Sequence, residues 1–319
     1  MKIKIIALVC VCMLALCACT ADADNVDAAF VPSAKSYNEE LPLNENSTDL
    51  LTEISVNESA AEDNYEDIIP EEEYTYLDSS WEYADYCAVH NDGAMLYRAK
   101  DNRKNRVIGV DAGHGTIGAN GEKIYCHPDQ SLKTTGGSTK AGSLKADAQN
   151  EGMKFNDGTT ENEINLKVAI AFKDRLLAKG YDVLMLREDE TIELDLLART
   201  LIANNKADCH ISIHYDSDGC NYDKGAFYIA VPDGIKDMPP VDKMWEEHDR
   251  LGECLIAGLK DEGIALYDGG RMEIDLIQTS YSTIPSVDME LGNQCSITDD
   301  AAIDKIVDGL IKGVNNFFE

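Results

Sequence analysis

The sequence is poor in basic residues, and this scarcity limits the partners it can have. Its 319 residues include 28 Lys and Arg against 59 Asp and Glu, which gives a formal net charge of −31 at pH 7. Binding to the phosphates of nucleic acid needs a basic face, so we expect no nucleic-acid partner. No Walker lysine follows any apolar run, and we expect no nucleotide ligand.

Paired cysteines of the kind that hold zinc are also missing. The chain has ten cysteines, but none of them form a C-x-x-C motif, which argues against a zinc site built from thiolates. Four belong to the apolar N-terminal run, and six follow it: Cys87, Cys126, Cys209, Cys220, Cys254 and Cys295. Spacing alone does not fix whether these six form disulfides.

Long apolar runs are absent except at the N-terminus. The tip Met1-Lys-Ile-Lys4 precedes an apolar run that ends at Cys19, and this pattern predicts a signal peptide over residues 1–19. Leu16-Cys-Ala-Cys19 resembles a bacterial lipobox, with Cys19 as the lipid-bearing residue. We therefore expect an exported protein, lipid-anchored on the outer face of the cytoplasmic membrane or in the cell envelope. The alternative is ordinary cleavage between Ala18 and Ala23, followed by secretion.

The segment after the leader is acidic and polar. From Thr20 to Glu73 it is rich in Asp, Glu, Asn and Ser, with Lys35 as its only base. Such a composition buries too little apolar surface to offset chain entropy, so we assign residues 20–75 to a disordered acidic linker. Residues 76–105 hold more aromatic side chains and a turn signal at Asn91-Asp-Gly93, which indicates a strand or hairpin without a defined function.

From Arg106 onward, strand patterns alternate with helix patterns. This alternation predicts an α/β fold, a single three-layer domain with a twisted, mostly parallel sheet flanked by helices. The expected helices are Glu161–Lys179, Glu193–Asn204, Asp242–Glu262 and Asp299–Phe317. Besides those that carry histidines, the expected strands are Tyr181–Leu186, Ala226–Val231, Glu273–Ile277 and Val287–Leu291.

Two strand patterns end on a histidine. The run from Val107 leads into Gly113-His114-Gly115, and the run from Cys209 ends at His214. The carboxyl ends of parallel strands are where open α/β sheets place their chemistry. His210 lies about 13 Å from His214 along the strand, too far for both to bind one metal ion. We favour His114 and His214 as ligands.

A metal site also needs an acid or a third imidazole. Glu161 and Glu163 open the first strong helix behind Thr160, where acids also stabilise the helix dipole. The two side chains point about 200° apart, so only one can face the site. Glu290 alternates with apolar residues in a strand, where burying an acid is costly, and it is a candidate general base.

These pieces together resemble a known family. From Val107 to about Gly309 the chain is similar to the zinc-dependent N-acetylmuramoyl-L-alanine amidases of the type 3 amidase family. The matching segments occur in the family's order over about two thirds of the chain: Val110–Gly115, Glu161–Ala169, Leu186–Asp189, Ala198–Asn204, Ala207–His214 and Pro285–Gly292.

The resemblance implies a site and a reaction. One zinc ion (Zn²⁺) would be held by His114, Glu161 and His214, with Glu290 as the catalytic base. Residues 106–319 would be the zinc amidase domain, with peptidoglycan as its partner. Zinc-activated water would cleave the amide between N-acetylmuramic acid and L-alanine. Arg187 and Arg199 match recurrent arginines, which we expect to be structural and paired with nearby acids.

Several positions depart from the family pattern. Ala112 stands where proline is usual, Asp216 where asparagine often follows the strand, and the turn after Glu290 differs. None removes a ligand or the base, so they bear on substrate preference more than on reaction type. Two other functions remain open, a zinc peptidase acting on wall stem peptides and a non-catalytic, lipid-anchored wall-binding protein.

A long insert separates His114 from Glu161. It spans roughly residues 116–159, is rich in Gly, Ser, Lys and Thr, and is longer than a usual connection. We predict a mobile loop at the rim of the site that contacts glycan or peptide. The alternative is a surface insertion without a function.

Overall fold

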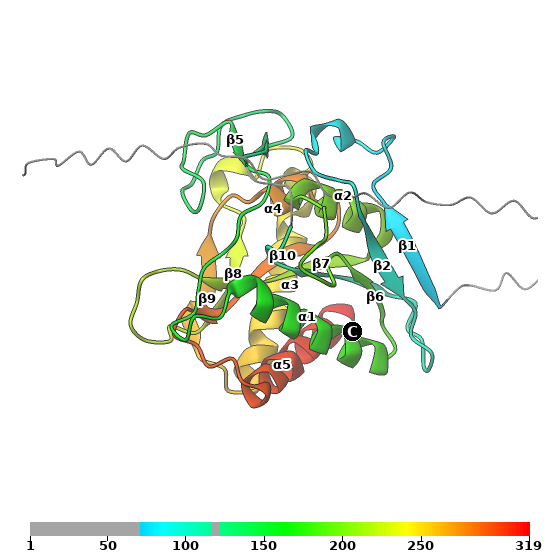
Figure 1. Ribbon diagram of the computed structural model, residues 1–319, viewed down its shortest axis with the longest axis vertical. Helices are drawn as coiled ribbons and strands as arrows, with labels where there is room; N and C mark the ends of the chain where they lie inside the picture. The colour runs from blue at the N-terminus through cyan, green and yellow to red at the C-terminus, as the bar shows by residue number, and fades with distance from the viewer. Residues whose placement is uncertain (1–70, 117–120) are drawn as a thin grey trace, which may run out of the picture. The chain divides into compact units, whose positions relative to one another are not determined.

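The computed structural model describes residues 71–116 and 121–319, and its centre is an eight-stranded sheet (Figure 1). The strand order is β1-β2-β6-β3-β7-β10-β8-β9. The four middle strands β6, β3, β7 and β10 run parallel to one another. The bounds are β1 (Glu72–Tyr76), β2 (Gly93–Tyr97), β3 (Val107–Ala112), β6 (Asp182–Met185), β7 (Cys209–Asp216), β8 (Ala226–Ala230), β9 (Leu266–Glu273) and β10 (Ser286–Asn293).

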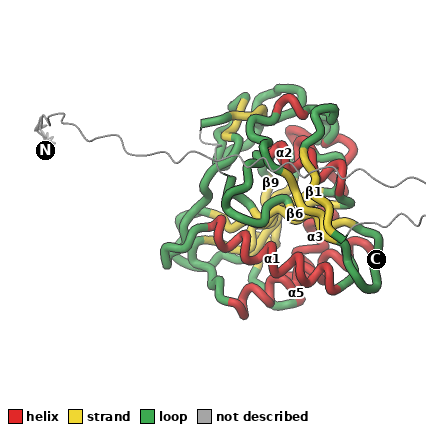
Figure 2. Tube along the Cα trace, turned by 45° about the vertical axis from the view of Figure 1, so that its right-hand side comes forward, coloured by secondary structure: helices red, strands yellow, loops and turns green. Residues whose placement is uncertain are grey.

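Helices cover both faces of this sheet. On one face lie α1 (Glu161–Ala178), α3 (Val241–Asp261) and α5 (Asp300–Phe318), and on the other lie α2 (Leu196–Lys206) and α4 (Ile277–Tyr281). Figure 2 shows α1 and α5 side by side beneath the strands, with α2 across the sheet from them. The prediction of a three-layer α/β domain with a mostly parallel sheet is confirmed.

The two faces of the central strands differ in chemistry. Toward α1, α3 and α5 the strands present buried aliphatic side chains, among them Val110, Ile211 and Met289. Because successive residues of a strand point to opposite faces, the residues between them face α2 and α4. These form rows of polar side chains, and one row pairs Asp111 with Ser212 of β7. The same alternation that builds the core therefore builds the polar face.

The N-terminal segment completes the edge of the sheet. β1 pairs antiparallel with β2, and β2 pairs antiparallel with β6. Residues 76–105 are therefore part of the same sheet as the strands that follow. β1 begins at Glu72, so the assignment of residues 72–75 to the disordered linker is wrong. A strand forms there because Tyr74 and Thr75 pair with Met95 and Ala94 of β2.

The predicted leader lies outside the described residues. The signal peptide, the lipid on Cys19 and residues 20–70 of the linker therefore stay as predictions. In the described ranges no helix has both the length and the apolar character needed to cross a bilayer. All six cysteines that follow the leader lie in the described part of the chain and are free thiols.

Two predicted elements need correction. An extended segment over Glu273–Ile277 is wrong, because β9 ends at Glu273 and Ile277 opens the short helix α4. The second predicted helix begins three residues late, at Leu196 rather than Glu193. Asp195 accepts a hydrogen bond from the backbone N–H of Ala198 and so caps the helix there.

The insert between β3 and α1 is packed against the domain. It contains an antiparallel strand pair, β4 (Lys123–Tyr125) and β5 (Lys145–Asp147). Its middle is held by the fully buried carboxylate of Asp275, 2.5 Å from Lys133 Nζ, 2.7 Å from Thr135 Oγ1 and 3.2 Å from His127 Nε2. Six contacts of this kind with one acid fix the insert to the loop before α4.

A matched pair of substitutions in α1 tests the assignment of its buried face. Phe172 is fully buried in the main core, whereas Ile170 on the same helix is 36% exposed. We expect Phe172→Ala to lower the free energy of unfolding by about 3–5 kcal/mol, and Ile170→Ala by less than about 1 kcal/mol. Urea unfolding of the full chain measures both. Equal losses would contradict the packing described.

Candidate metal centre

Three predicted ligands meet at the carboxyl edge of the sheet. His114 follows β3, Glu161 is the first residue of α1, and His214 lies near the end of β7. Glu161 Oε1 is 2.9 Å from His114 Nε2 and 3.1 Å from His214 Nδ1, and the two imidazole nitrogens are 3.2 Å apart. Within the described ranges this is the single group of three or more His, Cys, Asp or Glu that brings its donor atoms within 4.8 Å.

The donor atoms fit a tetrahedral zinc ion. Zinc bonds of about 2.0–2.1 Å place neighbouring ligand atoms about 3.3 Å apart, close to the three separations in the structure. Two imidazoles and one carboxylate form a donor set that leaves the fourth position of catalytic zinc open. The residues present are therefore suited to hold one zinc ion.

Hydrogen bonds orient two of the ligands. His114 Nδ1 is 3.0 Å from the carbonyl oxygen of Asn150, which can only accept, so Nδ1 carries the hydrogen and Nε2 keeps its lone pair. Glu161 accepts from the backbone N–H groups of Met153 (2.8 Å) and Tyr215 (3.2 Å). Burial opposes ionisation of Glu161, but the two imidazoles outweigh it and hold its pKa well below the usual range.

The contacts from Asn150 and Met153 come from the insert, and between them Gly152 lies directly against the ligands. Gly152 has φ +74°, and a Cβ there would lie 2.6 Å from Glu161 Oε2 and 2.7 Å from His114 Cδ2. The end of the insert therefore lies against the candidate metal centre and is not a detached surface insertion. Its contact with glycan or peptide remains a prediction.

The two residues that the sequence analysis did not choose as ligands, Glu163 and His210, lie away from the candidate site. Glu163 is exposed and forms a capping box with Thr160, accepting from the Thr160 N–H at 2.9 Å. His210 is 1% exposed, and its Nε2 is 3.7 Å from Asp111 Oδ2. The selection of Glu161 over Glu163, and of His214 over His210, agrees with this geometry.

Glu290 lies beside His214 in the sheet. The two residues are register partners in the parallel pair β10–β7, so their side chains project from the same face. Burial, and then the charge of Asp288, raise the pKa of Glu290 well above its usual value. Oε2 of Glu290 has no hydrogen-bond partner among the described residues. Such an environment disfavours the ionised carboxylate and suits a group that takes up a proton.

Asp288 is a site residue that the sequence reasoning did not assign. Its Oδ2 lies 3.8 Å from His214 Nε2, the nitrogen that points away from the other ligands. Burial by itself lowers the pKa of His214, but Asp288 and Glu161 outweigh it and raise that pKa to about 10. The signal was present, because Asp288 alternates with core residues in the same strand as Glu290.

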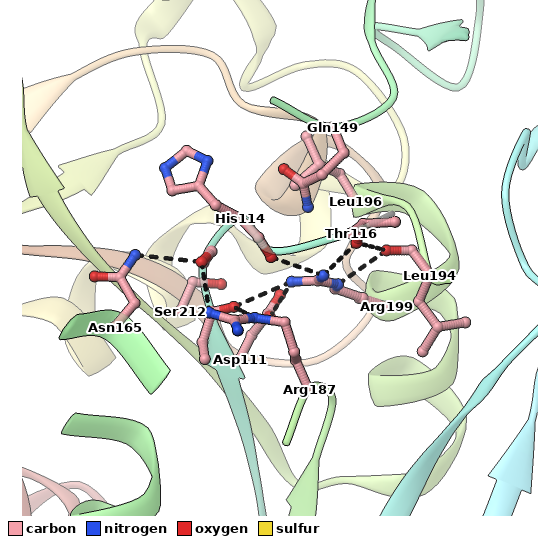
Figure 3. A network of polar contacts seen from close by, with 12 residues as sticks. Asp111, His114, Thr116, Gln149, Asn165, Arg187, Leu194, Leu196, Arg199 and Ser212 are labelled. Atoms are coloured by element: carbon pink, nitrogen blue, oxygen red, sulfur yellow. Dashed lines mark hydrogen bonds and ion pairs between the residues drawn. The ribbon is translucent and has the colours of Figure 1, made fainter. Parts of the chain in front are cut away.

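The two arginines act differently. Arg199 pairs with Asp111 at 2.8 Å, which confirms the expected pairing with an acid. Arg187 is fully buried but forms no ion pair with any described residue, so the expected pairing with an acid is wrong for this arginine. Its guanidinium donates instead to backbone carbonyl oxygens, those of Ala112 and Gly113 at the end of β3, Asn162 in the first turn of α1 and Asp189. Figure 3 shows Arg187 beneath the end of β3.

The spacing Gly113-x-Gly115-x-x-Gly118 also occurs in dinucleotide-binding turns, where the glycines open a helix. Here the next helix is α1, which begins only at Glu161. The residue between the first two glycines is His114, whose imidazole points toward Glu161. The geometry therefore favours the metal site over a nucleotide site.

A family model described as N-acetylmuramoyl-L-alanine amidase matches residues 108–308, well over half of the chain. The chain belongs to this family. It is accordingly a peptidoglycan amidase, a cell-wall hydrolase that acts on the amide between N-acetylmuramic acid and L-alanine. The matched range contains all four predicted site residues.

Solved structures share the fold at low sequence identity. The N-acetylmuramyl-L-alanine amidase Ami1 from Mycobacterium abscessus, in its apo form, has a TM-score of 0.56 and 20% identity, covering 67% of this chain and 99% of that one. Ami1 from Mycobacterium smegmatis has a TM-score of 0.55 and 19% identity, covering 67% and 96%. An uncharacterized protein of Bacillus subtilis (strain 168), YqiI, is 27% identical over 173 residues, 51% of this chain and 77% of that protein.

A glycine pair tests the contribution of the insert to metal binding. We expect Gly152→Ala to weaken zinc binding by this amidase about tenfold or more, because the new methyl group displaces Glu161 or His114. Gly158→Ala is the control, since Gly158 also has a positive φ (+94°) but its Cβ would meet nothing within 4 Å. Competition with a chelator measures both affinities. Equal affinities would refute the contact.

The raised pKa of Glu290 predicts that replacing this acid with a neutral side chain stabilises the metal-free fold, and that the gain depends on pH. In the unfolded chain Glu290 ionises above about pH 4.3, whereas the metal-free fold resists ionisation until a higher pH. Stability is therefore lost as pH rises between these two values. We expect Glu290→Gln to raise the urea midpoint of the chelated protein at pH 7.5 and to leave it unchanged at pH 4. A gain of the same size at both pH values would contradict the assignment.

Proposed function

We propose that the amidase cleaves its substrate with one zinc ion held by His114, Glu161 and His214. The observation that carries the proposal is the convergence of three donor atoms from separate chain segments, at separations of 2.9–3.2 Å. The hydrogen on His114 Nδ1 and the ionised state of Glu161 leave both residues in the form that binds a metal.

A zinc ion held by these three residues would lower the pKa of a water to about 7 and would polarise the amide carbonyl. Glu290 accepts a proton from the attacking water at its carboxylate and returns it to the leaving nitrogen of L-alanine. The raised pKa of Glu290 favours its uptake of the proton, and the same buried carboxyl group then holds the proton for transfer to the leaving nitrogen.

Asp288 supports this arrangement from the next position along the same strand face. Its carboxylate faces His214 Nε2 and keeps the hydrogen on that nitrogen, so metal binding would displace only the hydrogen on Nδ1. Asp288 therefore acts on His214 and not on the substrate. Ser212, its register partner in β7, bonds to Gln278 of α4 and takes no part in the chemistry.

We also propose the chain organisation that places the enzyme in the cell wall. Residues 1–19 form a signal peptide with Cys19 as the lipid attachment site, and an acidic linker leads to the catalytic domain. That domain starts at β1, since β1 and β2 extend the same sheet. An N-terminal lipid would hold the enzyme in the envelope near its peptidoglycan substrate.

Digestion of purified sacculi tests the reaction and the base together. We expect the full chain loaded with zinc to release stem peptides with a free L-alanine amino group, and a chelator to abolish the release. Glu290→Gln should reduce kcat by a factor of about 100 or more while retaining one zinc per chain. Mass spectrometry of the products and metal analysis give the two readouts.

The products separate this function from its alternatives. Cleavage within the stem peptide would identify a peptidase instead of an amidase. Binding to sacculi without cleavage would identify a wall-binding protein. Full activity of a Glu290→Gln variant that holds zinc would refute the role of the base, and full activity with chelator present would refute the role of the metal.

A further inference from the structure

His114 adopts an unusual backbone conformation for a residue with a bulky side chain. Its φ is +66°, in the left-handed region, and Gly115 follows with φ +76°. Non-glycine residues pay a conformational penalty in this region and persist there only when surrounding contacts hold them. The conformation that aims the His114 imidazole at Glu161 therefore depends on other groups.

The guanidinium of Arg199 supplies such contacts. It is fully buried beneath the turn after β3, and each of its five N–H donors has an acceptor (Figure 3). The acceptors are the carbonyl oxygens of Leu194 (3.1 Å), Ala112 (3.2 Å) and His114 (2.9 Å), the Asp111 carboxylate (2.8 Å) and Thr116 Oγ1 (2.5 Å). Arg199 thus bonds to the backbone of His114 itself and to residues on both sides of it.

Arg187 lies beside it but has a different set of partners. It donates to the carbonyl oxygens of Ala112, Gly113 and Asn162, and not to His114 or Thr116. The two arginines share the carbonyl oxygen of Ala112, but of the two it is Arg199 that bonds to the backbone of His114. A lysine has three donors on a flexible stem and does not reproduce this planar set of contacts.

We propose that Arg199 is a positioning residue of the metal centre, holding His114 in the left-handed turn that presents Nε2 to the metal. The inference rests on the proposed function, since it concerns the zinc site. It goes beyond a structural role, because the effect of Arg199 is transmitted through one ligand and appears in metal affinity.

Zinc affinity of the full chain tests this proposal. We expect Arg199→Lys to retain one zinc per chain with a dissociation constant 10 to 100 times higher, in the range found when partners of metal ligands are removed. Cobalt(II) substitution should show an altered visible spectrum, because the geometry of one imidazole ligand changes. Arg250→Lys is the control, since Arg250 also donates to a carbonyl oxygen, that of Phe317, but lies on α3.

A double-mutant cycle separates positioning from general stability. In a His114→Ala background, Arg199→Lys should cause no further loss of zinc affinity, because the ligand through which Arg199 acts is gone. An additional loss of the same size in that background would overturn the proposal.

The variant Thr116→Val provides a second test of the positioning role of Arg199, in case Arg199→Lys does not fold. It removes one acceptor of Arg199 and should weaken zinc binding about fivefold, the equivalent of one hydrogen bond. Unchanged affinity in this variant would overturn the proposal. A wild-type chain that binds no zinc would instead contradict the proposed function, so the two failures are distinguishable.

Discussion

A buried carboxylate between two imidazoles is the interaction around which this domain is organised. Glu161 is 3% exposed, and an acid in that position is costly unless its oxygens are fully used. Its partners come from the end of β3, from β7 and from the insert, so one side chain ties three distant segments to the start of α1. β3 and β7 run parallel, so their carboxyl ends lie at the same edge of the sheet, next to the start of α1.

The sequence predicted the parts of this arrangement that depend on local pattern. Helical period showed that only one of Glu161 and Glu163 can face the site, and the family resemblance selected Glu161. Strand geometry showed that His210 and His214 cannot bind the same ion, because the two residues lie a few positions apart on one strand. Parallel strands ending on histidines predicted the edge of the sheet that carries the site. The alternation in β10 also marked Glu290, and with the same logic it could have marked Asp288.

What the sequence did not predict depends on contacts between distant residues. The insert was open between a rim loop and a surface feature, because nothing local shows that Asn150 lies beside His114. Arg187 was expected to pair with acids, yet it meets carbonyl oxygens that only the end of β3 exposes. Strand β1 was placed in the linker because its acidic composition hides a pairing with β2.

The separation of the proposed ligands along the chain has a consequence for how the proposed zinc ion would be acquired. His114 and His214 are 100 positions apart in the chain, and their strands must pair before the nitrogens come within reach of each other. Parallel pairing of this kind closes long loops and is slow compared with helix formation. In the unfolded chain the proposed ligands are therefore not yet close together, and binding of the proposed zinc ion would follow folding. A bound ion would then shift the equilibrium toward the native state by mass action, so that metal supply and folding yield would be linked.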